Sequence, residues 1–211
     1  MKIQLFNVRL GLATNSSSSH SMIRLNENGK KKARDRDSGF DFQWDNFVLR
    51  SYESKLKYLA AMLWYTRRRL WSQHADRIKD VGYAYKYKKS LTTIESENLR
   101  VAVEVAKQIL KLCDLPETDR NVEELMFGGI DHDSGFQLPY IPANRQRTGP
   151  NLAYVANVKQ YLKDEGFAIL GGNDNDDGHP LKDSKYGKQI EGVGMDEDGK
   201  ITENLGAFGG W

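Results

Sequence analysis

The spacing of apolar residues between Asp45 and Leu70 constrains the fold more than any other feature of this sequence. Apolar side chains recur there at alternating steps of three and four residues, with Thr66 in the one gap; they are Leu49, Tyr52, Leu56, Leu59, Leu63 and Leu70. Since an α-helix turns once in about 3.6 residues, this spacing gathers them on one face. The sequence therefore predicts a helix of roughly thirty residues, starting near Asp45, that buries this face.

Two more long helices are predicted further along the chain. One begins near Thr92, because Thr92 and Glu95 have the spacing of a capping box. Its apolar stripe consists of Leu99, Ala102, Val103, Ala106, Ile109, Leu110 and Cys113. The other follows Pro150, which suits the first helical turn, and Gly166 is expected to cap its end. A short helix is also predicted at residues 122–126, and the first two long helices are expected to pack as a pair.

Strand signals lie towards both ends of the chain. Short apolar runs typical of strands occupy residues 2–10, 22–25 and 167–170, and two more flank Asp198-Gly199, a dipeptide typical of hairpin turns. Strands at both ends with helices between them predict an α+β fold. In this fold, two or three long amphipathic helices pack on a small, mostly antiparallel sheet built from the N- and C-terminal strands.

The length of the chain fits one domain, residues 1–211. Residues 26–38 have several turn formers and no apolar periodicity, so we expect an exposed loop there. No stretch approaches the ~20 apolar residues of a membrane span, and residues 1–10 lack the pattern of a secretory signal. The single cysteine, Cys113, excludes an internal disulfide and a four-cysteine zinc module in one chain. We therefore expect a cytoplasmic protein with no membrane partner.

The net charge of +2 hides a strong division along the chain. Residues 1–112 contain 22 lysines and arginines and 11 acidic residues, a net charge of +11, whereas residues 113–211 contain 9 and 18, a net charge of −9. A basic half is typical of proteins that contact a polyanion, and an acidic half can attract cations. The alternative is that the two halves neutralise one another, either within the fold or between subunits through self-association.

One pattern of glycines and aspartates occurs twice, 43 residues apart. The sequence GG-x-D-x-D-x-G spans residues 128–135 and again residues 171–178. Alternating carboxylates on a glycine-bounded loop can converge on one hard cation, and a neighbouring imidazole suits Mn²⁺ or Zn²⁺. The candidate metal ligands are Asp131, Asp133, Asp174 and Asp176, with His132 and His179 beside them, and the candidate ions are Mg²⁺, Mn²⁺ and Ca²⁺. The alternative is ordinary turn chemistry, since glycine and aspartate are common in turns for backbone reasons.

A run of serines follows the first predicted strand, from Ser16 to Ser19, and His20 ends it. If this segment is a loop, its hydroxyls and amides can cradle a phosphate; the residues concerned are Ser16, Ser17, Ser18, Ser19 and His20. A second interpretation has His20 activate a nearby serine as a nucleophile, which also requires an orienting acid. The third is a purely structural turn.

Residues 9–21, RLGLATNSSSSHS, carry a family resemblance. A short basic and apolar segment, a glycine and a (T/S)-N-S-S-S-S motif make this stretch similar to the opening of many uncharacterised bacterial and phage proteins. The resemblance covers only these residues. It implies a bacterial or phage origin, with the host cytoplasm as the location if the protein is phage-encoded, and it assigns no catalytic residue.

Aromatic and basic residues are interleaved in two stretches of the basic half. Arg67, Arg68 and Arg69 follow Trp64 and Tyr65, and residues 83–89 read YAYKYKK. Aromatic rings stack on unpaired bases while lysine and arginine neutralise phosphates, so the pattern is typical of a nucleic-acid surface. The candidate nucleic-acid-binding residues are Arg67, Arg68, Arg69, Tyr85, Lys86, Lys88 and Lys89. The alternative is that the tyrosines line the core and the arginines form a solvated helix face.

Two hypotheses of function follow. The first is a non-catalytic binding or accessory protein, phage-encoded if the resemblance holds, whose basic aromatic surface contacts nucleic acid or an acidic protein. The second is a metal-dependent phosphoesterase or nuclease, in which the four aspartates hold metal ions and His132 or His179 acts as a ligand or proton carrier. We favour the first, because no complete catalytic constellation occurs in the sequence.

Overall fold

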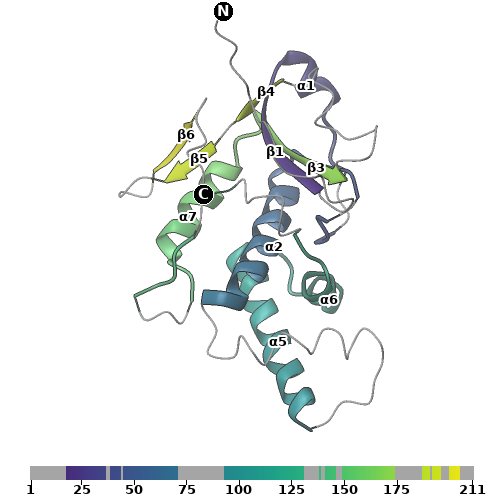
Figure 1. Cartoon of the computed structure of the whole chain (residues 1–211), viewed down its shortest axis with the longest axis vertical. Helices are drawn as coiled ribbons and strands as arrows, with labels where there is room; N and C mark the ends of the chain where they lie inside the picture. The colour runs from purple at the N-terminus through teal and green to yellow at the C-terminus, as the bar shows by residue number, and fades with distance from the viewer. Residues whose placement is uncertain are drawn as a thin grey trace, which may run out of the picture.

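The computed structural model describes residues 18–36, 39–43, 45–70, 93–130, 138, 141–145, 149–173, 187–190, 192–195 and 200–204. The elements in chain order are β1 (Ser18–Leu25), α1 (Glu27–Lys32), β2 (Phe47–Leu49), α2 (Tyr52–Leu70), α5 (Thr93–Leu112), α6 (Asp119–Phe127), α7 (Leu152–Leu162), β3 (Phe167–Asn173), β4 (Gly187–Ile190), β5 (Gly192–Met195) and β6 (Ile201–Asn204). Helices thus lie between strands from the two ends of the described chain, and the predicted α+β class is confirmed (Figure 1).

The main sheet joins strands that are far apart in the sequence. Its order is β2-β3-β1-β4, and every neighbouring pair is antiparallel. Met22 lies at its centre, opposite Ile169 of β3 on one side and Ile190 of β4 on the other. β5 and β6 form a separate antiparallel pair, with Met195 opposite Ile201, which agrees with the predicted hairpin. The strand predicted at residues 2–10 lies outside the described residues.

The two faces of the sheet pack against different parts of the chain, because successive side chains of a strand point to opposite faces. The main core contains Met22 and Ile169 together with residues of α2, α5, α6 and α7. A smaller cluster on the other side is formed by Ile23, Leu25, Ala168 and Leu170 with Ala33, which directly follows α1. The sheet is therefore covered by the long helices on one face and by the α1 segment on the other (Figure 1).

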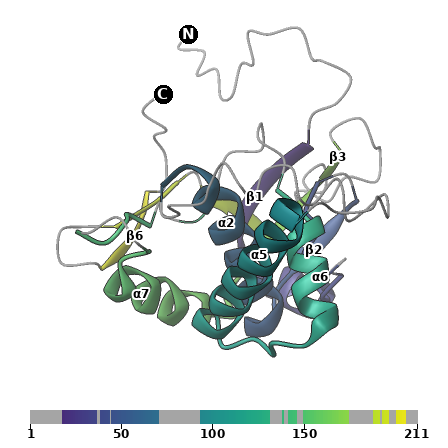
Figure 2. The same ribbon diagram turned by 90° about the horizontal axis from the view of Figure 1, so that it is seen from below.

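Helix α2 occupies the centre of the molecule. Every residue from Tyr58 to Trp64 is buried, so the helix is covered around its whole circumference and not only along the predicted stripe. It contacts α5, α6 and α7, which surround it (Figure 2). No helix in the described part of the chain is both long enough and apolar enough to cross a membrane.

The predicted start of this helix, near Asp45, is wrong. The helix begins at Tyr52, and Leu49 belongs to the short strand β2, which pairs with β3. Phe47 and Leu49 are buried and Val48 is half-buried, which is the alternation of a strand. The side chain of Ser51 accepts a hydrogen bond from the Ser54 amide and so marks the true start of the helix.

The other helices lie close to their predicted positions. α5 begins at Thr93, one residue after the predicted start, and the short helix predicted at residues 122–126 extends over the whole of α6. α7 is capped by Asn151, whose side chain accepts from the Ala153 amide, so Pro150 precedes the helix and does not form its first turn. Gly166 is not the cap of α7; that position is Lys163, which has a right-handed helical conformation.

The prediction of a loop at residues 26–38 is wrong where α1 forms. Asn26 caps this helix by accepting a hydrogen bond of 2.7 Å from the Gly29 amide, and Lys30, Lys31 and Lys32 form its last turn. The negative charge of Glu27 near the start of the helix and the positive charges near its end both interact favourably with the helix dipole. The helix has only six residues, so it shows no apolar periodicity from which it could have been predicted. The predicted exposure is correct for most of the described part of the segment.

Lys55 is a fully buried charged residue in the middle of this core. Its Nζ atom lies 2.6 Å from the carbonyl oxygen of Asp164, 3.4 Å from that of Leu162 and 3.8 Å from the ring centre of Phe167. The amine therefore satisfies carbonyls at the end of α7, which a helix cannot pair internally. Burial lowers the pKa of Lys55 to about 8, against the smaller opposing effect of Asp164 and other nearby carboxylates.

We predict that the contribution of Lys55 to stability, taken as the difference between wild type and Lys55→Met at each pH, rises between pH 7 and pH 9.5. The difference is needed because burial raises the pKa of Cys113 to about 12, which lowers stability over the upper part of the same range. A lysine pKa that is lower in the folded state means that the unfolded chain binds more protons in this range, so this contribution increases with pH by about 2 kcal/mol. Urea unfolding across this range measures the effect. Lys57→Met on the same helix should follow the pH dependence of wild type, and a difference between wild type and Lys55→Met that does not change with pH would contradict the assignment.

Candidate functional site

The structure describes only some of the residues that were predicted to form sites. Arg67, Arg68 and Arg69 lie in the last turns of α2. Ser18, Ser19 and His20 lie in β1. The other candidates lie outside the described residues; they are Ser16, Ser17, Tyr85, Lys86, Lys88, Lys89, Asp131, His132, Asp133, Asp174, Asp176 and His179. Among the residues described, no three histidine, cysteine, aspartate or glutamate side chains are grouped so that they could hold a metal ion.

The serine run is not a loop at its described end. Ser18, Ser19 and His20 form the beginning of β1 and pair with the last residues of β3. His20 is buried, its Nδ1 atom lies 3.0 Å from the Tyr58 hydroxyl oxygen, and its ring packs edge-on against Phe47. The expected loop is therefore a strand at these three residues, and the His20 side chain is packed in the core, while a phosphate-binding role of the serine run stays a prediction.

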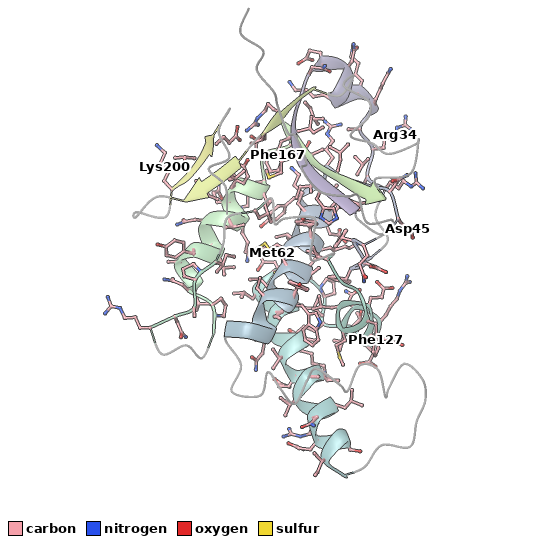
Figure 3. The ribbon with its side chains drawn as sticks, viewed as in Figure 1. Arg34, Asp45, Met62, Phe127, Phe167 and Lys200 are labelled. Atoms are coloured by element: carbon pink, nitrogen blue, oxygen red, sulfur yellow. The ribbon has the colours of Figure 1, made fainter. Side chains whose placement is uncertain are left out.

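A cluster of exposed cations lies elsewhere, on the segment from Lys30 to Arg36, which we call the basic segment. Its cationic residues are all exposed and are Lys30, Lys31, Lys32, Arg34 and Arg36. Figure 3 shows Arg34 at the edge of the molecule, with its side chain directed away from the sheet. These cations were not among the predicted site residues, because the segment was expected to be an exposed loop, although the run KKKARDR is typical of a basic surface.

Hydrogen bonds fix the basic segment to the body of the protein. The backbone of Arg36 exchanges two hydrogen bonds with Val48, of 2.8 and 2.9 Å. The guanidinium of Arg50 donates to the carbonyl oxygens of Lys30 and Ala33, which are at the end of α1. Since Ala33 is also buried against the second face of the sheet, the cations project from a well-anchored backbone.

The only acidic residue of the basic segment, Asp35, is engaged with α2. Its carboxylate accepts hydrogen bonds from the amides of Arg50 and Ser51, at 2.6 and 3.0 Å, and from the Ser54 hydroxyl at 2.7 Å. Burial alone would raise the pKa of Asp35, but these hydrogen bonds together outweigh burial and hold the pKa below its usual value. The carboxylate therefore caps the start of α2 and is not directed at the neighbouring cations.

Few of the cations of the basic segment are paired with carboxylates that the structure describes. Lys30 forms an ion pair of 2.7 Å with Glu27. Lys31, Lys32, Arg34 and Arg36 form no ion pair with any residue that the structure describes. By contrast, Arg100 and Arg120 on other helices are each paired with a glutamate of their own helix. Four of the five cations of the basic segment, which lies over the outer face of the sheet, thus have no carboxylate partner among the described residues.

The glycine pairs at the start of the two predicted acidic loops both pack against the segment from Phe40 to Phe47. Gly129 accepts a hydrogen bond of 2.8 Å from the amide of Phe42, and a side chain at Gly128 would overlap the carbonyl of Phe40. Gly171 lies opposite Phe47 in the sheet, where an added Cβ atom would be 2.5 Å from the Phe47 ring. The rings of Phe42 and Phe47 are 5.2 Å apart. Both loops therefore start from neighbouring points on the segment from Phe40 to Phe47.

No protein-family model matches this chain, and neither a curated protein sequence nor a solved structure does. The function is therefore argued from the geometry and charge of the described residues.

We predict that Asp35→Asn destabilises the protein at neutral pH by about 1 kcal/mol, which is typical for the loss of a helix cap. The folded pKa of Asp35 is lowered, so its contribution is present above the unfolded pKa and is lost as the pH falls through the folded pKa. Urea unfolding at pH 7 and pH 3 should show that the difference from wild type shrinks in acid. The exposed Asp45→Asn is the matched control, and an equal loss in this control would contradict the capping role.

Proposed function

We propose that the protein is a non-catalytic binding or accessory protein that contacts nucleic acid through the basic segment. One observation carries the proposal: Lys31, Lys32, Arg34 and Arg36 are exposed, and no described carboxylate pairs with them. Clustered cations of this kind attract a polyanion, and each phosphate that they neutralise releases a counterion, which favours binding. Nucleic acid presents such phosphates at high density, one negative charge per about 1.7 Å of duplex axis.

The anchoring of the segment supports the same function. Exposed lysine and arginine side chains lose rotamer freedom when they bind, and a mobile backbone would add a further entropy cost. Here the Arg36–Val48 hydrogen bonds and the Arg50 guanidinium already hold the backbone. Only the side chains remain to be ordered on binding.

The predicted cations of α2 lie at a different place. The basic segment is bonded to the start of α2 through Asp35, whereas Arg67, Arg68 and Arg69 lie in the last turns of that helix. A helix of nineteen residues is about 28 Å long, so the two groups lie at opposite ends of it. A nucleic acid that contacts both would follow the length of α2. The contribution of Tyr85, Lys86, Lys88 and Lys89 stays a prediction.

We predict salt-sensitive binding of the full chain to a 25-nucleotide DNA or RNA, measured by fluorescence anisotropy at 50 and 200 mM salt. A variant with Lys31, Lys32, Arg34 and Arg36 all changed to glutamine should bind at least tenfold more weakly at 50 mM salt, because four phosphate contacts are lost. In a matched control, Arg100 and Arg120 are changed to glutamine. Each forms an ion pair with a glutamate of its own helix, so this variant should bind like wild type. If wild type binds neither DNA nor RNA at 50 mM salt, the proposal is wrong.

A second candidate function is divalent-cation binding by the two acidic loops, with metal-dependent phosphoester hydrolysis as the associated activity. The observation in its favour is that the glycine pairs at the start of both loops pack against the segment from Phe40 to Phe47. This arrangement brings the starting points of the two loops together. A shared ion would polarise a phosphoryl oxygen and activate water.

For this candidate we predict that Mg²⁺, Mn²⁺ or Ca²⁺ raises the melting temperature, because a ligand that binds only the folded state stabilises it. Asp131→Ala and Asp174→Ala should each abolish the shift if both loops bind the same ion. Asp45→Ala, an exposed carboxylate outside both loops, should retain it. The absence of a shift with all three ions would remove this candidate.

A further inference from the structure

The basic segment differs from a surface that reads single-stranded bases. Between Asn26 and Arg36 there is no aromatic residue, and the exposed side chains there are charged or amide groups. Recognition of unpaired bases depends on aromatic rings on which the bases stack. This part of the protein therefore has the groups that contact phosphates and lacks the groups that stack on bases.

Helix α1 is also unsuited to reading base pairs in a groove. It has six residues, about 9 Å in length, and Gly29 on one side of it is buried against the protein. Recognition helices enter the major groove with several side chains that reach base edges. Here the end of the helix packs against the sheet through Ala33, and the cations follow one another along its last turn and the next four residues.

We propose, on the basis of the function proposed above, that the basic segment binds double-stranded nucleic acid through its phosphates and without regard to base sequence. The duplex presents one negative charge per about 1.7 Å of its axis, roughly twice the density of a single strand. The duplex is also stiff. Because the backbone of the basic segment is anchored as well, binding costs little conformational entropy in either molecule. A flexible single strand would have to be ordered on a surface that offers its bases no contact.

Arg50 is a positioning residue in this site. Its guanidinium bonds the carbonyl oxygens of Lys30 and Ala33, so it sets the path of the backbone that carries the cations. It is half-buried, and its amide is held by Asp35. Loss of this guanidinium leaves Lys31, Lys32, Arg34 and Arg36 in the sequence but removes the anchor of their backbone.

The experiment measures the affinity of the full chain for three 25-nucleotide probes. Two are duplexes of unrelated sequence and equal length, and the third is a single strand. Wild type should bind both duplexes equally within twofold and the single strand at least fivefold more weakly. Four phosphate contacts predict a slope of about −3.6 for log K against log salt concentration, and the four-glutamine variant of the basic segment should lose most of this slope. Arg50→Gln should weaken duplex binding several-fold with an unchanged slope, while circular dichroism verifies that it is folded.

Each other outcome has a distinct meaning. No binding of any probe by wild type contradicts the proposed function itself. Binding that prefers one duplex sequence, or the single strand, contradicts this inference and leaves the proposed function intact. Binding that the four-glutamine variant retains places the contact elsewhere in the chain and also contradicts the inference. Equal binding of polyglutamate at the same ionic strength shows a general affinity for acidic chains and would overturn the assignment to duplex.

Discussion

The burial of helix α2 on all sides is the constraint on which the rest of the structure depends. Residues from Tyr58 to Trp64 are all covered, by the sheet on one side and by α5, α6 and α7 on the others. A charged group at such a position needs internal partners, since an unpaired buried charge is strongly unfavourable. Lys55 meets this requirement by bonding the carbonyls that end α7, and it thereby ties the second half of the chain to the first.

The same constraint explains where the positive charge of the N-terminal half lies. Because the middle of α2 is enclosed, the exposed cations of this half that the structure describes lie on other elements, namely the basic segment and α5. The cations of the basic segment lie over the opposite face of the sheet, where only a small apolar cluster around Ala33 is covered. Asp35 and Arg50 join that segment to the start of α2, so the central helix and the proposed binding surface share one set of hydrogen bonds.

The local patterns of the sequence were sufficient for most helices and strands. The stripe that ends at Cys113 and the hairpin signal at Asp198-Gly199 both correspond to elements close to their predicted positions. The errors arose where a short segment is determined by a distant partner. Leu49 continues the helical spacing but pairs with β3. The end of α1 is held by the Arg50 guanidinium, and Asp35 after it is held by the Arg50 amide, contacts that no local pattern contains.

The sequence by itself determined the class of fold, the approximate positions of the long helices that the structure describes and the excess of positive charge in the N-terminal half, because these follow from local periodicity and composition. Only the tertiary structure decided which cations lack a carboxylate partner among the described residues. Asp35 is next to Arg34 and Arg36 in the sequence, and it appears there as their natural partner. In the fold it is held by the amides at the start of α2, and the neighbouring arginines stay exposed. The partners of Asp35 are therefore determined by hydrogen bonds between residues distant in the chain, and local spacing does not encode such bonds.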